Sequence, residues 1–111
     1  TEALTVIDVN SGKNIVKKDV HENFLKINIE AAKEIATQLR LRNLSGIIIV
    51  DFINLKSKEA EALLLKEFRT ALKNDPVKTD IVDITKLGLV ELTRKKMKKS
   101  LVDVLRGTSE L

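Results

Sequence analysis

The fold class follows from one apolar run, Ile47-Ile48-Ile49-Val50-Asp51-Phe52-Ile53, in which Asp51 is the only polar residue. β-Branched residues dominate this run, and its length suits a strand better than a helix. The apolar residues are continuous rather than alternating, which is typical of a central strand of a parallel sheet with both faces covered. We therefore expect a buried central strand over residues 47–53.

Two amphipathic helices are predicted, one before and one after this strand in the sequence. Asp19 and Glu22 have the spacing of a capping box, and the apolar stripe that follows predicts a helix to about Asn43. Asn28 interrupts that stripe, so it either bonds to neighbouring backbone or braces a site at the end of the sheet. Ser57 is the expected N-cap of a second helix, which ends before Asn74-Asp75-Pro76.

Three further strands complete the predicted pattern. We expect them over residues 4–9, about 80–84 and 87–93, with a basic loop over 13–18 and a short C-terminal helix near 101–105. This order predicts an α/β fold with a mostly parallel or mixed four-stranded sheet and two main helices packed on it. Residues 1–105 would form one subdomain and residues 106–111 a C-terminal tail.

The composition narrows the class of protein. A length of 111 residues suits one globular domain, and no apolar run approaches the roughly 20 residues of a membrane span. The chain has no cysteine, so disulfides and thiolate metal sites are excluded within it and a reducing cytoplasm is the expected location. Thr1 precedes a strand pattern almost directly, so we expect the chain to be part of a longer protein.

Positive charge is concentrated near the C-terminus. Lys and Arg outnumber Asp and Glu by 20 to 16, and the basic residues cluster at Arg94, Lys95, Lys96, Lys98 and Lys99. A basic cluster attracts polyanions, although such a face is more often only solvated. The cluster alone therefore does not establish nucleic-acid binding.

Two aspartates are the main candidates for chemistry. Asp8 and Asp51 lie near the carboxyl ends of two strands that we expect to be neighbours, where open α/β sheets bind ligands. Burial of an unpaired carboxylate in such apolar runs is unfavourable, and helix N-termini, the basic cluster or a bound cation could offset it. Two carboxylates with an amide nearby suit a hard cation such as Mg²⁺. Asn10, two residues after Asp8, would address the same ligand. A single Asp-x-Asn more often forms a turn, but aspartates at the ends of two strands that we expect to be adjacent favour a metal site.

Other common sites are not indicated. The sequence contains neither G-x-G-x-x-G nor G-x-x-x-x-G-K-[ST], and His21 is its only histidine. Phe24, Phe52 and Phe68 fall on apolar stripes, so we expect them in the core rather than stacked on bases. RNA, if bound, would be contacted through its phosphates.

Four stretches together resemble the ribonuclease E/G family. They are Val6-Ile7-Asp8-Val9-Asn10-Ser11-Gly12, residues 28–44, residues 46–53, and Thr85-Lys86-Leu87-Gly88-Leu89-Val90-Glu91-Leu92-Thr93-Arg94-Lys95. The resemblance covers nearly the whole chain in the right order. It implies the deoxyribonuclease-I-like subdomain of the family's catalytic region.

The resemblance also implies a function. Asp8 and Asp51 match the aspartates that bind the catalytic Mg²⁺, and Asn10 matches the asparagine that helps to place the scissile phosphate. Members of the family cut single-stranded A/U-rich RNA, leave 5′-phosphate and 3′-hydroxyl ends, and favour a 5′-monophosphate. Lys13, Arg94 and Lys95 are our candidates for contacts with RNA phosphates.

The sequence departs from the family pattern in two places. Asn54 stands where relatives often have an acidic residue, which puts a third carboxylate in doubt. The family continues to a Cys-Pro-x-Cys zinc link between two protomers, and this chain has no cysteine to form one. The resemblance implies a homo-oligomeric parent enzyme whose other parts carry most of the RNA-binding surface.

Two other functions stay open. The chain could be a non-catalytic RNA-binding or assembly module that uses the basic segment 94–99. A phosphatase of the haloacid dehalogenase type is the other, because Asp8-Val9-Asn10 has some likeness to its Asp-x-Asp loop. Asn10 disfavours the phosphatase, since it stands where the general acid is needed.

Overall fold

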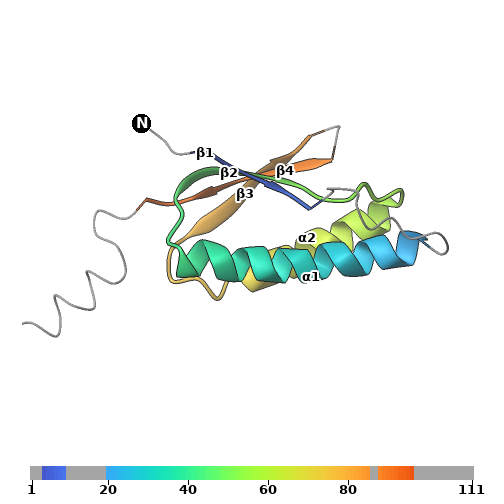
Figure 1. Cartoon of the computed structure of the whole chain (residues 1–111), viewed down its shortest axis with the longest axis horizontal. Helices are drawn as coiled ribbons and strands as arrows, with labels where there is room; N and C mark the ends of the chain where they lie inside the picture. The colour runs from blue at the N-terminus through green and yellow to red at the C-terminus, as the bar shows by residue number, and fades with distance from the viewer. Residues whose placement is uncertain (1–3, 10–19, 86–87, 97–111) are drawn as a thin grey trace, which may run out of the picture.

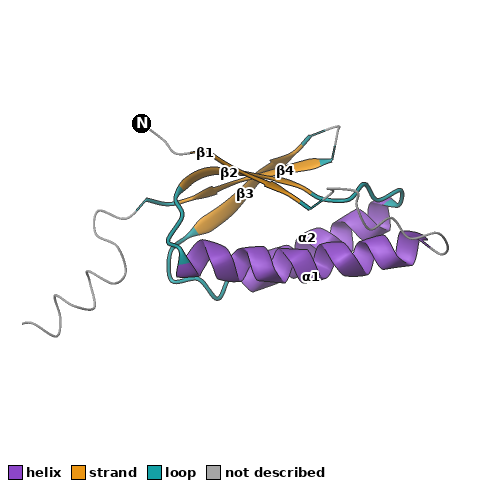
Figure 2. Cartoon of the chain, viewed as in Figure 1, coloured by secondary structure: helices purple, strands orange, loops and turns teal. Residues whose placement is uncertain are grey.

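Two helices and four strands make up the computed structural model, which describes residues 4–9, 20–85 and 88–96. In chain order they are β1 (Leu4–Asp8), α1 (Val20–Leu41), β2 (Gly46–Asp51), α2 (Lys58–Leu72), β3 (Thr79–Ile84) and β4 (Leu89–Arg94). Both helices lie on the same side of the sheet (Figure 1; Figure 2). The α/β prediction is confirmed, while the basic loop 13–18, the short helix near 101–105 and the tail 106–111 lie outside the described residues.

The sheet is mixed and has the strand order β1-β2-β4-β3. β1 pairs with β2 in parallel through the crossover helix α1, whereas β4 is antiparallel to both β2 and β3. The sequence allowed a mostly parallel or a mixed sheet, and the mixed form is correct. The reason is the short connection between β3 and β4, which can join antiparallel strands but not parallel ones.

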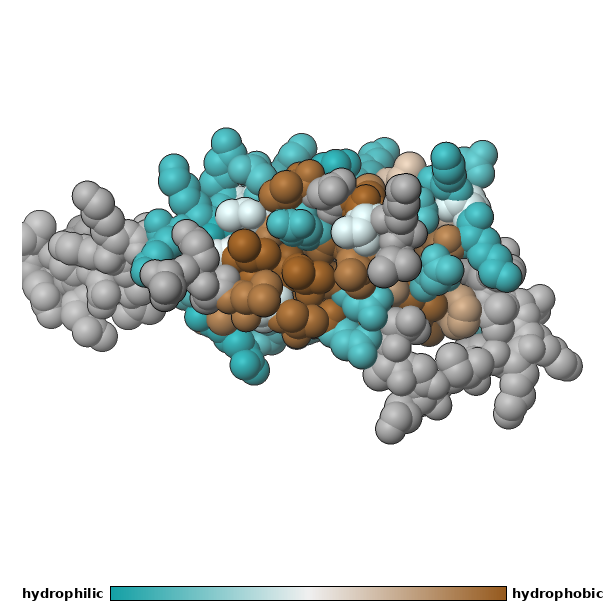
Figure 3. All heavy atoms as spheres, turned by 90° about the horizontal axis from the view of Figure 1, so that it is seen from above, coloured by the Kyte–Doolittle hydropathy of each residue, from teal (hydrophilic) through white to brown (hydrophobic). Residues whose placement is uncertain are grey.

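Only one face of the sheet is covered by the helices. Along β2 the burial alternates, with Ile48 and Val50 buried and Ile47 and Ile49 only half-buried. The prediction that both faces of this strand are covered is therefore wrong for the described part of the chain. We call the side away from the helices the open face, and an apolar patch is visible on it (Figure 3).

The core lies between the sheet and the two helices. Phe52 and Phe68 pack edge to face in it, with ring centroids 5.6 Å apart. The predicted cap of α2 is confirmed, because the Ser57 hydroxyl accepts a hydrogen bond of 3.1 Å from the backbone N–H of Ala60. The buried apolar residues that pack together in this core are Ala32, Ile35, Ala36, Leu39, Ile48, Val50, Phe52, Leu55, Leu64, Phe68, Leu72, Val90 and Leu92.

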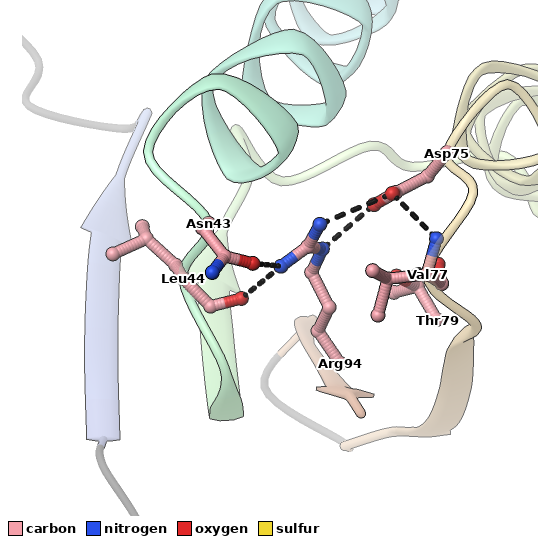
Figure 4. A network of polar contacts seen from close by, with 6 residues as sticks. All are labelled: Asn43, Leu44, Asp75, Val77, Thr79 and Arg94. Carbon is pink, nitrogen blue, oxygen red and sulfur yellow. Dashed lines mark hydrogen bonds and ion pairs between the residues drawn. The ribbon is translucent and has the colours of Figure 1, made fainter. Parts of the chain in front are cut away.

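A buried arginine links three segments of the chain at one end of the sheet (Figure 4). Arg94, at the end of β4, is 1% exposed, and its Nε and Nη2 donate to the two carboxylate oxygens of Asp75 at 2.7 and 3.1 Å. Its Nη1 donates to Asn43 Oδ1 at 3.0 Å and to the Leu44 carbonyl at 2.7 Å. One guanidinium thus joins β4, the segment after α2 and the turn between α1 and β2.

The turn that receives this arginine is a helix C-cap. Asn43 has a φ of 52°, which asparagine tolerates better than most residues. The backbone N–H groups of Asn43 and Leu44 donate to the carbonyls of Arg40 and Leu39, which is the Schellman pattern. The Asn43 side chain therefore faces Arg94 because of how the helix ends.

Asp75 is held in its charged form by this network. Burial alone would raise the pKa of Asp75, but the hydrogen bonds from Arg94 and from the Val77 N–H, with the charges of Arg94 and Arg40, lower that pKa below its usual value. A carboxyl group with a lowered pKa in the folded state stabilises the fold above its unfolded pKa of about 3.9. That stabilisation is lost as the pH falls through the folded-state pKa.

We predict that Asp75→Asn lowers the free energy of unfolding by about 3 kcal/mol at pH 7, because Arg94 loses its buried counter-charge. The difference from the unsubstituted chain should shrink as the pH falls below the unfolded pKa of about 3.9 and on through the lowered folded-state pKa of Asp75, where Asp75 itself becomes neutral. Urea unfolding between pH 7 and about pH 2 measures this, with the exposed Asp80→Asn as control. A difference that does not change with pH would contradict this account of the network.

Candidate metal centre at the carboxyl ends of two parallel strands

Asp8 and Asp51 are direct neighbours across β1 and β2. They form the last pair of the parallel register, and the Val9 N–H donates to the Asp51 carbonyl at 2.9 Å. Paired residues of adjacent strands lie about 4.8 Å apart and project to the same face. The alternation of burial along β2 places that pair on the open face. The prediction that the two strands are neighbours, with the aspartates at one edge, is confirmed.

The environment of the two carboxylates differs from the expectation. Asp8 is exposed and Asp51 is half-buried, so neither is enclosed in the apolar run. Within the described residues, neither side chain accepts a hydrogen bond or forms an ion pair. Burial therefore does not favour a cation here. A cation is favoured because the two carboxylates place like charges side by side without a counter-charge among the described residues.

The donor set fits a hard divalent cation. Among residues 4–9, 20–85 and 88–96, no three His, Cys, Asp or Glu side chains form a group that could hold a metal ion, so the candidate site consists of the adjacent pair Asp8 and Asp51. Mg²⁺ commonly binds through one or two carboxylates and keeps several waters. Asn10, the third predicted member, lies outside the described residues.

The hairpin between β3 and β4 reaches the same edge. Leu89 pairs with Asp51, and the Leu89 N–H donates to the Thr85 hydroxyl at 3.1 Å. Gly88 has a φ of 87°, a conformation that is strained for residues with a side chain, and so the turn requires glycine there. β4 begins directly after this glycine, at Leu89, and position 87 of the predicted strand lies outside the described residues.

Asn54 lies beside this turn. Its Oδ1 is 3.9 Å from the position that a Cβ atom would take on Gly88. The stretch that follows Asp51 and the stretch that begins at Thr85 therefore meet at the edge that carries the aspartates. Sequence reasoning identified both stretches but did not place them together.

Asn28 also acts at this edge. It is fully buried, and its amide group exchanges two hydrogen bonds with the backbone of Ile53, at 2.8 and 2.9 Å. Ile53 follows Asp51 by two residues. Asn28 thus bonds to backbone, which is the first of the two roles that the sequence left open, and this backbone directly follows the end of β2.

The structure does not place the predicted phosphate-binding residues beside the aspartates. Arg94 is buried and its guanidinium is bonded to protein groups, so the prediction that it contacts RNA is wrong. Lys95 is exposed, but β4 runs antiparallel to β2, which places Lys95 at the opposite end of the sheet, about 20 Å from Asp51. Lys13 lies outside the described residues.

Other cations gather near Lys95 that the sequence did not single out. Arg69 and Lys73 from the end of α2, with Lys78 before β3, line an open hollow of about 440 Å³. The Lys95 N–H donates to the Lys78 carbonyl at 2.9 Å, so these segments adjoin. We refer to Arg69, Lys73, Lys78, Lys95 and Lys96 as the basic end. The i, i+4 spacing of Arg69 and Lys73 was the only signal in the sequence.

We predict that Arg94→Gln lowers the free energy of unfolding by about 3–5 kcal/mol, because it leaves Asp75 buried without a partner. Lys95→Gln, the adjacent and exposed matched control, should change it by no more than about 0.5 kcal/mol. Chemical denaturation at pH 7 measures both. A fully stable Arg94→Gln variant with weakened RNA binding would restore the original prediction for Arg94.

Comparison with known proteins identifies relatives of this chain. The model of the Ribonuclease E/G family matches residues 1–97. Ribonuclease E of Nostoc sp. is 47% identical over 108 residues, which are 97% of this chain and 16% of that protein. Ribonuclease G of Haemophilus influenzae is 46% identical over 105 residues, covering 95% of this chain and 21% of that protein.

A third relative is the Ribonuclease E/G-like protein of Pyropia yezoensis, 45% identical over 108 residues, or 97% of this chain and 21% of that protein. The chain thus spans about a fifth or less of the length of these relatives. Neither of the helices in the described residues has the length and apolar character of a membrane span. From the match over residues 1–97, the chain belongs to the ribonuclease E/G family.

Proposed function

We propose that this chain forms the Mg²⁺-dependent catalytic centre of an endoribonuclease. The observation that carries the proposal is the register pair of Asp8 and Asp51 on one open strand edge. Membership of the ribonuclease E/G family supports RNA as the substrate class. Within this proposal the substrate is single-stranded A/U-rich RNA, and the products have 5′-phosphate and 3′-hydroxyl ends.

The two carboxylates explain why a cation belongs to the site. Asp8 and Asp51 place two negative charges side by side, and these repel an RNA phosphate as well as each other. A divalent cation held by both would neutralise that charge and let a phosphate approach. When bound, it supplies Lewis-acid polarisation of the phosphoryl group and acidifies a water molecule for in-line attack.

The protein's part in this chemistry is to fix the donors. The β1–β2 ladder sets the separation of the aspartates, and Val9 anchors the backbone of Asp51. The open face beside them leaves room for an extended RNA strand, since no helix covers this face in the described structure (Figure 1). Asn10 would hold the scissile phosphate against this pair.

We predict that Asp8→Asn or Asp51→Asn lowers single-turnover RNA cleavage by more than about 100-fold, because each removes one of the two protein ligands to the cation. RNA binding in EDTA should be largely retained, since the phosphate contacts do not depend on these side chains. Asp80→Asn, an exposed aspartate at the other end of the sheet, is the matched control. Normal cleavage by both site variants would rule out the proposed centre.

A second candidate function, RNA binding without cleavage, is favoured by the basic end. Its members come from α2, from the segment before β3 and from the residues after β4. Of the nearby acids, Asp75 is neutralised by Arg94, whereas Asp80 lines the same hollow. A surface with several cations and one free carboxylate suits the phosphates of a nucleic acid.

We predict that the triple variant Arg69→Gln, Lys73→Gln, Lys78→Gln binds single-stranded A/U-rich RNA more weakly and with a flatter salt dependence. Loss of three phosphate contacts should reduce the slope of log affinity against log salt by about 2. Fluorescence anisotropy in EDTA over a salt series measures this, with Lys33→Gln on α1 as control. An unchanged slope would remove the basic end as an RNA surface. A reduced slope, with normal cleavage by Asp51→Asn, would favour the second candidate over the first.

A further inference from the structure

Asn28 is a fully buried polar side chain that uses its whole amide group on one distant residue. Its Nδ2 donates to the Ile53 carbonyl at 2.8 Å, and its Oδ1 accepts from the Ile53 N–H at 2.9 Å. The two residues are 25 positions apart in the chain. Asn28 lies on the face of α1 that otherwise buries apolar residues, so an apolar side chain would suit the local packing better.

Ile53 needs both of these hydrogen bonds. Regular pairing of β2 ends at Asp51. Residues 52–55 continue outside the strand, and the side chains of Phe52 and Leu55 are buried. Among the described residues, the N–H and the carbonyl of Ile53 have no strand partner, and a backbone group left without one is unfavourable. The amide of Asn28 offers one acceptor and one donor, as a neighbouring strand would.

The backbone of Asp51 is consequently held on both sides. The Val9 N–H holds the carbonyl of Asp51, and Asn28 holds both polar groups of Ile53. These three contacts fix the path of the chain from Asp51 to Ile53, and with it the direction of the Asp51 side chain relative to Asp8. A metal site needs its ligands placed to within about 0.5 Å, which requires such support.

We propose that Asn28 is a positioning residue of the Asp8–Asp51 centre: it holds the end of β2 so that both carboxylates share one divalent cation. This inference rests on the proposed function, because it takes the two aspartates as the ligands. Asn28 does not touch the cation or the RNA. It acts through the backbone at Ile53.

The test compares Asn28→Ala with Leu39→Ala, a buried residue of the same helix near its other end. Mn²⁺ affinity is measured by electron paramagnetic resonance on each folded protein, well below its unfolding temperature. Asn28→Ala should weaken Mn²⁺ binding by about 10- to 100-fold, as loss of support around metal ligands typically does. Leu39→Ala should leave the Mn²⁺ affinity within about twofold, although its loss of core packing destabilises the protein comparably or more.

Equal Mn²⁺ affinity in Asn28→Ala and the unsubstituted protein would overturn the inference. If Asn28→Ala does not fold, Asn28→Gln is measured in its place. The longer Gln side chain keeps the donor and the acceptor of the amide but cannot hold Ile53 in the same position. Weaker Mn²⁺ binding by Asn28→Gln supports the role, and unchanged binding overturns it. Asp51→Asn is measured in parallel: if it also binds Mn²⁺ normally, the metal centre itself fails, and not only the role of Asn28.

Discussion

Parallel pairing of β1 with β2 is the constraint on which the rest of the structure depends. The crossover through α1 brings the two strands side by side and places their carboxyl ends at one edge. β4 then pairs with the free side of β2, and its hairpin with β3 brings Gly88 to that edge as well. A shift of one residue between β1 and β2 would turn one aspartate to the opposite face from the other. The candidate centre therefore exists only in this register.

Two buried polar side chains secure β2 at its opposite ends. Arg94 joins the segments around the entry to β2, and Asn28 holds the segment that follows its last residue. Both bond to main-chain groups that leave regular secondary structure, where unpaired polar atoms would be unfavourable. Arg94 does so with a counter-charge, which makes its contribution depend on pH. Asn28 is neutral, so its contribution does not.

Charge is divided between the two ends of the sheet. Asp8 and Asp51 lie at one end, and the basic end lies about 20 Å away along β4. The antiparallel direction of β4 causes this separation, since it carries Lys95 away from the aspartates. An extended polyanion held at the basic end could then reach the carboxylate edge along the molecule, which makes the two candidate surfaces complementary.

Local patterns in the sequence determined the elements and the two aspartates. Apolar periodicity, the Ser57 cap and the turn residues predicted helices and strands close to α1, β2, α2 and β3, because these signals act over a few neighbouring residues. The strand-helix-strand order also placed Asp8 beside Asp51. The family resemblance added the expected chemistry.

Only the tertiary structure decided which distant groups meet. The bonds from Arg94 to Asp75 and from Asn28 to Ile53 join residues 19 and 25 positions apart, and no periodicity encodes such pairs. Arg94 is one of several cations in a basic run, yet its position on the helix side of β4 buries it, whereas Lys95 and Lys96 are exposed. The continuous apolar run of β2 likewise predicted two covered faces, whereas two helices on one side cover only one. Sequence spacing states which side chains share a strand; the packing of the whole chain decides which of them water and ligands can reach.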